Sequence, residues 1–218
     1  MNSVLYITRN GLLEPLGQSQ VMAYLKGLSK ENSITLITYE KSEDWFNKDA
    51  MAKAKAECES YNIKWSPQRF RSRLKLISHV LSIIQMIWLV RREVLISGIK
   101  LIHARSYIPA AVALIVGRLT KVPFIFDMRA LWPEELIAAK RLRKGSIIHR
   151  IIVVIERFCL AESSGIVSLT NAAVSYLKLK YPAELTNKSI VVIPTCADLK
   201  RFTPKQNKNI GTTVHGCI

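Results

Sequence analysis

Acidic residues are scarce in this sequence. Its 218 residues include 16 Asp and Glu against 32 Lys and Arg, which gives a formal net charge of +16 at pH 7. The excess is uneven, because residues 66–150 contain 16 basic and 4 acidic side chains. Such a field raises encounter rates with polyanions, which include phosphorylated substrates, acidic membrane surfaces and nucleic acid. The charge alone does not choose among these partners.

Cysteines are also few, and they are not patterned. Cys58, Cys159, Cys196 and Cys217 form no C-x-x-C pair, and no histidine stands at ligand spacing from them. A zinc site is therefore not expected. Scattered thiols are typical of a reducing compartment, and the first residues lack the charged and apolar regions of a signal peptide. We expect a cytoplasmic protein without a metal or an organic cofactor.

Long hydrophobic runs are absent as well. The nearest candidate for a membrane span, residues 74–90, is interrupted by Lys75 and His79. Both are costly to bury in hydrocarbon, so we do not expect a spanning helix. With 49% hydrophobic and 22% charged residues, the composition is instead that of a globular chain.

Short apolar runs alternate with longer helical patterns along the chain. Continuously apolar runs such as VLYIT, FIF and IVVI are typical of strands buried on both faces. The alternation predicts an α/β fold: a Rossmann-like, doubly wound parallel sheet of about seven strands with helices on both faces. Strands are expected at residues 4–8, 34–39, 63–65, 101–104, 124–127, 165–168 and 190–193. Helices are expected at 19–31, 45–61, 71–97, 108–119, 146–162 and 172–181.

The carboxyl end differs from the rest. After residue 202 comes the polar stretch TPKQNKNIGTT, and then the apolar start VHGCI. We therefore predict one domain over residues 1–202, with a linker and the start of a truncated second domain over residues 203–218.

Ligands of doubly wound sheets bind outside the carboxyl ends of the strands. The first such segment, RNGLLEPLGQSQ, contains Gly11 and Gly17 and opens a helix near Gln18 and Ser19. A helix amino terminus with a nearby glycine suits a phosphate. The segment is neither G-x-G-x-x-G nor a Walker sequence, which removes support for nicotinamide, flavin and simple nucleotide-hydrolase functions. A turn with a helix cap at Ser19 explains the same residues.

The tips of the fourth and fifth strands are polar. His103 and Arg105 stand at the first tip, and Asp127 and Arg129 follow the second. Asp127 could act on a hydroxyl group, and Arg129 could hold a phosphate. A structural histidine and a simple Asp–Arg ion pair are the alternatives.

The fifth tip continues into LWPEE. Trp132 could stack on a sugar face, with Glu134 and Glu135 beside it. The alternative is that Trp132 packs on Pro133.

Five ordered segments resemble one family. LLEPLGQSQVMAYLKGLS, HARSY, DMRALWPEE, IVSLTNAA and VIPTCADLKRF resemble consecutive motifs of the amino-terminal, acceptor-side domain of GT-B-fold retaining glycosyltransferases of family four. The likeness covers residues 1–202. It departs where Thr195, Cys196 and Ala197 replace the usual N-G-V of the hinge.

The resemblance implies sugar transfer from a nucleotide-diphosphate sugar to a lipid-linked or polysaccharide acceptor, as in polysaccharide biosynthesis of the cell envelope. In such enzymes a carboxyl-terminal domain holds the nucleotide sugar and an E-x7-E motif, and this chain ends before it. We therefore expect the 218 residues to be inactive alone. The implied donor-diphosphate residues are Gly11, Gly17, Gln18 and Ser19, the acceptor residues are Arg105, Arg129, Trp132 and Glu135, and the catalytic residues are Asp127 and His103.

Residues 69–92 form a basic amphipathic segment. RFRSRLK opens it, and Arg91 and Arg92 close it around an apolar side that includes Leu81 and Trp88. This pattern predicts peripheral binding to an anionic membrane surface, at the inner face of the cytoplasmic membrane. Packing of the apolar side on the sheet is the alternative. Two rival functions stay open: a non-catalytic scaffold, and a basic nucleic-acid-binding domain that has charge but no recognised motif.

Overall fold

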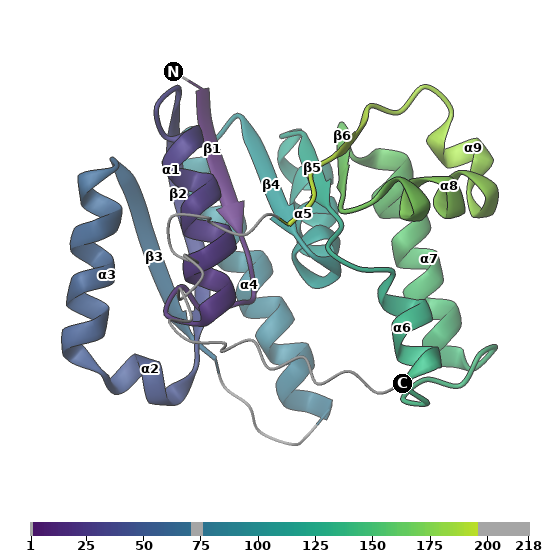
Figure 1. Ribbon diagram of the computed structural model, residues 1–218, viewed down its shortest axis with the longest axis horizontal. Coiled ribbons are helices and arrows are strands. Elements are labelled where there is room, and N and C mark those ends of the chain that lie inside the picture. Colours follow the sequence, from purple (N-terminus) through teal and green to yellow (C-terminus); the bar gives the residue numbers. More distant parts are fainter. Residues whose placement is uncertain (1, 71–75, 196–218) are drawn as a thin grey trace, which may run out of the picture.

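The computed structural model describes residues 2–70 and 76–195 and places seven parallel strands in one sheet (Figure 1). The strand order is β3-β2-β1-β4-β5-β6-β7. The prediction of about seven parallel strands is confirmed. The strands are β1 (Asn2–Ile7), β2 (Asn32–Glu40), β3 (Ile63–Arg69), β4 (Leu101–Arg105), β5 (Phe124–Asp127), β6 (Gly165–Ser168) and β7 (Ile190–Val192). β3 runs past its expected end through Pro67, which an edge strand tolerates.

The helices differ more from expectation. The expected helix over 45–61 is split, because the Asn47 side chain accepts a hydrogen bond from the Ala50 amide at 3.1 Å and caps a new helix. Two short helices, α6 (Trp132–Ala138) and α9 (Pro182–Leu185), were not predicted. Each has a proline in its first turn. The described helices are η1 (Gly17–Met22), α1 (Ala23–Leu28), α2 (Ser42–Phe46), α3 (Lys48–Ser60), α4 (Leu76–Ile96), α5 (Tyr107–Thr120), α6 (Trp132–Ala138), α7 (Ile147–Glu162), α8 (Asn171–Lys180) and α9 (Pro182–Leu185).

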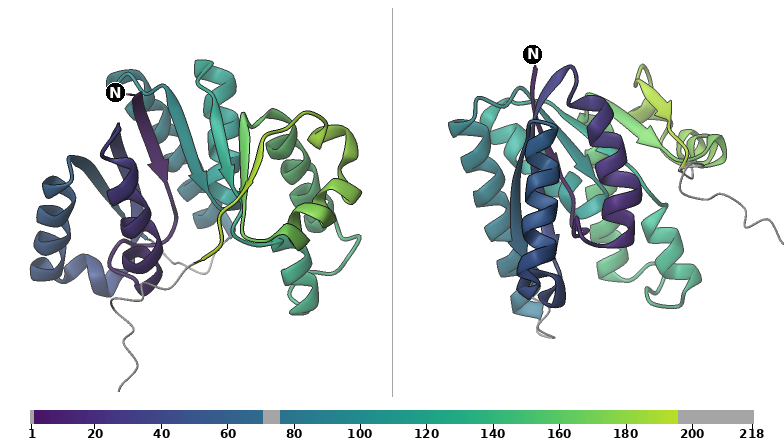
Figure 2. Two further views of the ribbon diagram at one scale, coloured as in Figure 1. Left: turned by 45° about the horizontal axis from the view of Figure 1, so that its top comes forward. Right: turned by 60° about the vertical axis from the view of Figure 1, so that its left-hand side comes forward.

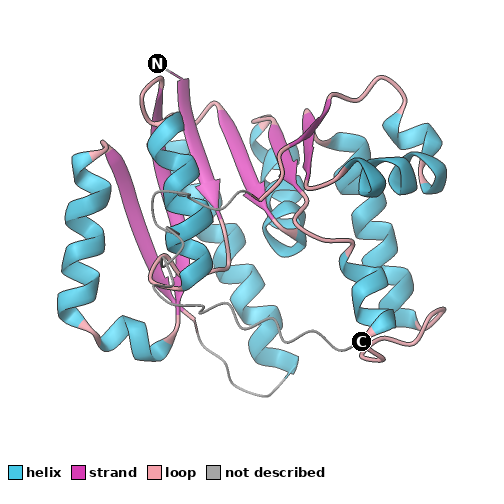
Figure 3. Cartoon of the chain, in the orientation of Figure 1, coloured by secondary structure: helices cyan, strands magenta, loops and turns pink. Residues whose placement is uncertain are grey.

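Both faces of the sheet are buried, and the two-residue period of the strands divides the core. Tyr6 of β1 points into a cluster with residues of η1, α1 and α3. Its neighbours Leu5 and Ile7 point into a larger cluster with residues of α4, α5 and α7. Figures 2 and 3 show these helices on opposite sides of the sheet. The prediction of a doubly wound sheet is confirmed.

All strands run in one direction, so their carboxyl ends meet at one edge. β1 lies in the interior of the sheet order, with β2 and β3 on one side and β4 to β7 on the other. The predicted linker over 203–218 lies outside the described residues. Within the described ranges, no helix is both long and apolar enough to cross a membrane.

Candidate functional site

The tips of β4 and β5 bring together the polar residues predicted from the sequence. The parallel register sets Arg105 beside Asp127. His103, two residues earlier on the same face, lies with its Nε2 atom 3.3 Å from Asp127 Oδ2 and donates a hydrogen bond to it. Arg129 follows β5 and places NH1 3.4 Å from Asp127 Oδ1. Both carboxylate oxygens of Asp127 are therefore engaged.

The two arginines share a second partner that sequence analysis missed. Gln20 of η1 accepts hydrogen bonds through Oε1 from Arg105 NH2 at 2.5 Å and from Arg129 NH2 at 3.2 Å. Arg105 NH1 also lies 3.8 Å from Asp127 Oδ2, and Arg129 NH2 donates to Thr195 Oγ1 at 3.2 Å. Three partners from different parts of the chain, Gln20, Asp127 and Thr195, thus fix the two guanidinium groups.

Asp127 stays ionised although it is buried. Burial by itself would raise the pKa of Asp127, but the hydrogen bond and charge of His103, and the charges of Arg129 and Arg105, hold that pKa below its usual value. Asp127 is 3% exposed and Arg105 6% exposed. Two cations beside one carboxylate leave the site with surplus positive charge, which favours an anionic ligand.

A cavity of about 280 Å³ opens beside this cluster. It lies at the ends of β5, β6 and β7 and against η1 and α1. Its walls are formed by Ser19, Gln20, Ala23, Tyr24, Arg105, Asp127, Arg129, Val167, Ile193, Pro194 and Thr195. We call it the Asp127 cavity.

His103 is not among the residues that line the Asp127 cavity, and its catalytic role stays a prediction. The side chain is 4% exposed because β4 continues past it to Arg105. Its ring is stacked on Tyr6 at 4.5 Å between centroids and meets the edge of Tyr24 at 5.8 Å. His103 therefore orients Asp127 from behind.

The turn that follows β4 carries backbone strain next to the site. Ser106 has φ 78, in a region that residues other than glycine rarely adopt. Its amide donates to the Asp127 carbonyl at 2.8 Å, which ties the two strand tips together. Strain of this kind persists where neighbouring contacts over-determine the conformation.

The loop after β1 is held by its own contacts. The helix begins earlier than predicted, so Ser19 lies inside η1 and donates its hydroxyl to the Pro15 carbonyl at 2.6 Å instead of capping the helix. The Gln18 side chain donates to the Leu12 carbonyl at 3.0 Å, and its amide donates to the Glu14 carbonyl at 3.0 Å. Contact of Gln18 with a diphosphate would therefore require these bonds to change.

Both loop glycines are explained by close packing. A Cβ on Gly17 would lie 2.1 Å from the Gly11 carbonyl oxygen, and one on Gly11 would lie 2.6 Å from Glu40 Oε2. Glu40, which the sequence analysis did not single out, is fully buried at the end of β2. It accepts the amides of Leu12 at 2.8 Å and Leu13 at 3.3 Å, and so anchors the loop.

Two predicted acceptor residues lie away from the Asp127 cavity. Trp132 opens α6 and packs against the Tyr107 ring at 5.5 Å, which is a packing role. Glu135 is exposed in the first turn of α6 and is not among the lining residues. The packing of Trp132 on Tyr107 does not favour direct contact with a ligand in the Asp127 cavity. The position of Glu135 does not favour it either.

The basic segment over 69–92 is described only in part. Arg71, Arg73 and Lys75 lie outside the described residues. In α4, Met86 and Val90 are buried against the sheet, so the alternative packing accounts for one side of the helix.

The other side of α4 is exposed. Leu81 is 54%, Ile84 54% and Trp88 62% exposed. Arg92 lies over the Trp88 ring at 5.6 Å.

In the part of the chain that the structure describes, no group of three or more His, Cys, Asp or Glu residues could hold a metal ion. Cys58 and Cys159 are buried, and burial raises the pKa of each thiol to about 12. These thiols stay protonated.

A known family matches most of the chain. The profile of the glycosyl transferase 4-like domain family matches residues 20–196. The match begins at Gln20, so the loop from Gly11 to Ser19 precedes it. No protein of curated function matches the sequence.

Solved glycosyltransferase structures share the fold. HepE from Anabaena, solved with UDP and glucose, has a TM-score of 0.54 at 13% identity over 93% of this chain and 47% of its own. Sucrose-phosphate synthase from Thermosynechococcus elongatus has a TM-score of 0.62 at 10% identity, over 94% and 51%. UGT89C1 from Arabidopsis thaliana, complexed with UDP-L-rhamnose, has 0.52 at 14%, over 90% and 53%. This chain thus spans about half the length of these proteins and has the fold of one Rossmann-like half of GT-B enzymes.

Proposed function

Because the chain belongs to the glycosyl transferase 4-like domain family, we propose that it is the acceptor-binding half of a retaining glycosyltransferase. The enzyme would move a sugar from a nucleotide-diphosphate sugar to a lipid-linked or polysaccharide acceptor, without a metal or an organic cofactor. The observation that carries the proposal is the Asp127 cavity, where Arg105 and Arg129 flank a buried, ionised carboxylate.

Sugar transfer requires charge on the departing diphosphate to be neutralised and the acceptor oxygen to be aimed at the anomeric carbon. In our proposal Arg105 and Arg129 supply the positive charge. Asp127 accepts a hydrogen bond from the acceptor hydroxyl, and His103 positions Asp127. Backbone amides of the segment from Gly11 to Ser19 would bind the donor diphosphate.

The proposal includes a second domain, in the same chain or in a partner. The solved relatives are about twice as long as this chain, and HepE was solved with UDP and glucose. A second domain that binds the nucleotide sugar would also close the site to water. The 218 residues alone would then bind acceptor but not transfer sugar.

Transfer of radiolabelled sugar from a panel of nucleotide sugars to a lipid extract tests the function, with the gene product in its natural length as enzyme. Arg129→Gln should lower the transfer rate about 10- to 100-fold, because one cation facing the developing charge is lost. The matched control is Arg118→Gln, which removes an arginine whose partner Glu162 lies outside the site. Equal rates for the two variants would contradict the proposed site, and transfer by the 218 residues alone would contradict the need for a second domain.

We further propose that α4 docks on the inner face of the cytoplasmic membrane. Its exposed apolar residues lie before and after the exposed cations Arg91 and Arg92, an arrangement that suits an anionic bilayer. Trp88→Ser should lower sedimentation with phosphatidylglycerol vesicles several-fold.

The matched control for Trp88→Ser is Leu179→Ser, which removes an exposed apolar residue of α8. Equal sedimentation of the two variants would contradict docking through α4. Retention of oligonucleotides at physiological salt would favour the rival nucleic-acid function.

A further inference from the structure

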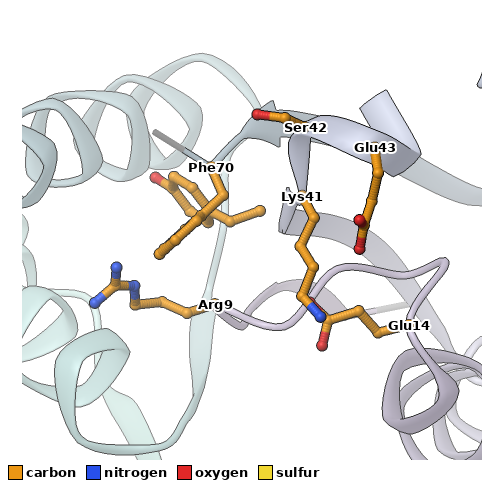
Figure 4. Close-up of a pocket in the computed structure, with 7 residues that line it drawn as sticks. Arg9, Glu14, Lys41, Ser42, Glu43 and Phe70 are labelled. Atoms are coloured by element: carbon orange, nitrogen blue, oxygen red, sulfur yellow. The ribbon is translucent and has the colours of Figure 1, made fainter. Parts of the chain in front are cut away.

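A second cavity lies at the same edge of the sheet, on the other side of β1 from the Asp127 cavity. Its volume is about 430 Å³, and its walls are formed by the residues that follow β1, β2 and β3 (Figure 4). They are Arg9, Glu14, Tyr39, Lys41, Ser42, Glu43 and Phe70. We call it the Arg9 cavity. Its size is in the range of small-ligand pockets.

Arg9 is a partly buried cation that forms no ion pair with any residue of the ranges 2–70 and 76–195. Its guanidinium lies over the Phe70 ring at 5.2 Å, and Figure 4 shows the two side chains facing one another. Burial lowers the pKa of Arg9, and the Tyr39 phenol opposes that effect only at a pH high enough to ionise it. Within the described ranges, Arg9 forms no hydrogen bond or ion pair, and Glu14, which lines the same cavity, is paired with Lys41 at 3.6 Å. The planar guanidinium fork therefore keeps donors that match a phosphate or a carboxylate.

The rest of the wall suits a sugar ring. Phe70 and Tyr39 offer aromatic surface, and Ser42 and Glu43 offer polar groups at the opening. Burial raises the pKa of Tyr39 to about 12, so its hydroxyl remains neutral and can donate to a ligand. Aromatic faces with nearby polar groups are a common way to hold a saccharide.

The charged residues of the Arg9 cavity favour a ligand with a single negative group over a diphosphate. The wall carries two cations, Arg9 and Lys41, and two carboxylates, Glu14 and Glu43, so its formal charge is neutral overall. A diphosphate carries more negative charge than Arg9 offsets, whereas a single phosphate or carboxylate is matched by the one guanidinium. The Asp127 cavity, with its surplus of positive charge, suits the diphosphate better.

We propose that the Arg9 cavity binds the single negatively charged group, a phosphate or a carboxylate, of a saccharide acceptor, with Arg9 as its main ligand. This rests on the proposed acceptor-binding function. It assigns the acceptor to the class of acidic or phosphorylated saccharides, which is narrower than the family membership implies. Arg9 and Glu14 precede the range that the family profile matches. None of the residues that line the Arg9 cavity lines the Asp127 cavity.

Ligand-observed NMR titration of the chain with three probes tests the assignment. The probes are glucose 6-phosphate, glucuronate and glucose, which share a ring and differ in the charged group. The phosphate or the carboxylate should bind at least about tenfold more tightly than glucose, and the stronger of the two identifies the natural group. Equal affinity for all three probes would overturn the proposal.

Variants locate the binding. Arg9→Gln should remove the preference for the charged probes, and Arg9→Lys, which keeps the charge but loses the planar fork, should retain part of it. Arg92→Gln is the matched control, because Arg92 also lies over an aromatic ring but belongs to α4. Equal effects of Arg9→Gln and Arg92→Gln would refute the site. Since binding is measured without transfer, a protein that fails to transfer sugar would refute the proposed function and leave this test intact.

Discussion

The two cavities beside β1 differ in the partners of their arginine side chains. In the Asp127 cavity, Arg105 and Arg129 are held by Asp127 and Gln20 at hydrogen-bond or ion-pair distance. In the Arg9 cavity, the guanidinium of Arg9 lies over the Phe70 ring, and it has no ion-pair partner in the part of the chain that the structure describes. A cluster that is already neutralised in part is preorganised, and it contributes to stability as well as to binding. A cation without a counter-charge contributes little to stability, so its effect should appear when an anion binds.

The largest expected effect comes from removing the shared anion of the first cavity. Asp127→Ala would leave His103, Arg105 and Arg129 without their counter-charge, and breaking a buried ion pair costs about 3–5 kcal/mol. Urea denaturation should report a loss of that size. A loss below about 1 kcal/mol would mean that the cluster is solvated and that the two cavities do not differ as described.

Asp127→Asn tests the role of the Asp127 charge through the pH dependence of the free energy of unfolding. Because the pKa of Asp127 is lowered in the folded protein, the stability from its ionised form is present above the unfolded value of about 3.9. It is lost as the pH falls through the lowered folded pKa. The asparagine variant should therefore lose less stability on acidification than the parent protein, and an identical acid profile would contradict this assignment.

The next effect concerns the loop between the cavities. Glu40→Ala would leave the Leu12 and Leu13 amides and the Thr38 hydroxyl, which donates to Glu40 at 2.6 Å, without their acceptor. Unsatisfied buried donors of this kind cost about 1–3 kcal/mol. Hydrogen exchange of the loop amides should accelerate more than exchange of the α5 amides, and a uniform acceleration would argue against a specific anchor.

Glycine substitutions probe the same loop by packing. Gly17→Ala would place a methyl group against the Gly11 carbonyl and should cost about 1–3 kcal/mol. Gly27→Ala is the control, since a Cβ there meets nothing within 4 Å, and in helix α1 it should stabilise by about 0.5–1 kcal/mol. Thermal melts compare the two, and a shift of the same sign for both would contradict the packing argument.

The smallest change in stability is expected for the Arg9 cavity. Arg9→Gln should change the free energy of unfolding by less than about 0.5 kcal/mol, because no ion pair is lost. Arg105→Gln, at a buried site with two partners, should cost more. If both variants lost the same stability in parallel urea titrations, the contrast between the cavities would fail.

Much of the site follows from the sequence pattern. Asp127 and Arg129 follow one apolar strand, and His103 and Arg105 belong to another, so parallel pairing alone predicts that they meet. All seven strands were predicted, most of them because buried parallel strands are continuously apolar; β3, with the sequence IKWSPQR, is the exception. The burial of His103 agrees with the structural alternative that the sequence analysis kept open, and β4 extends one residue past its expected end, to Arg105.

Other parts of the site could not be predicted in this way. Gln20 reaches the arginines because of how η1 is turned toward β4 and β5, which no local pattern specifies. Trp132 looked like a sugar platform but packs on Tyr107, a residue of α5. One feature of the sequence could have indicated the role of Glu40. It is an acidic residue at the end of the apolar strand ITLITYE, where the amides of the glycine-containing loop need an acceptor.

The sequence by itself determined the parallel α/β architecture, the surplus of basic residues and the chemistry gathered at one edge of the sheet, because these depend on local periodicity and composition. Only the tertiary structure decided which cations are neutralised. Arg129 and Gln20 are 109 positions apart, and Glu40 and Leu12 are 28 apart. Electrostatic and hydrogen-bond energies depend on distances in space and on burial, and folding alone sets both.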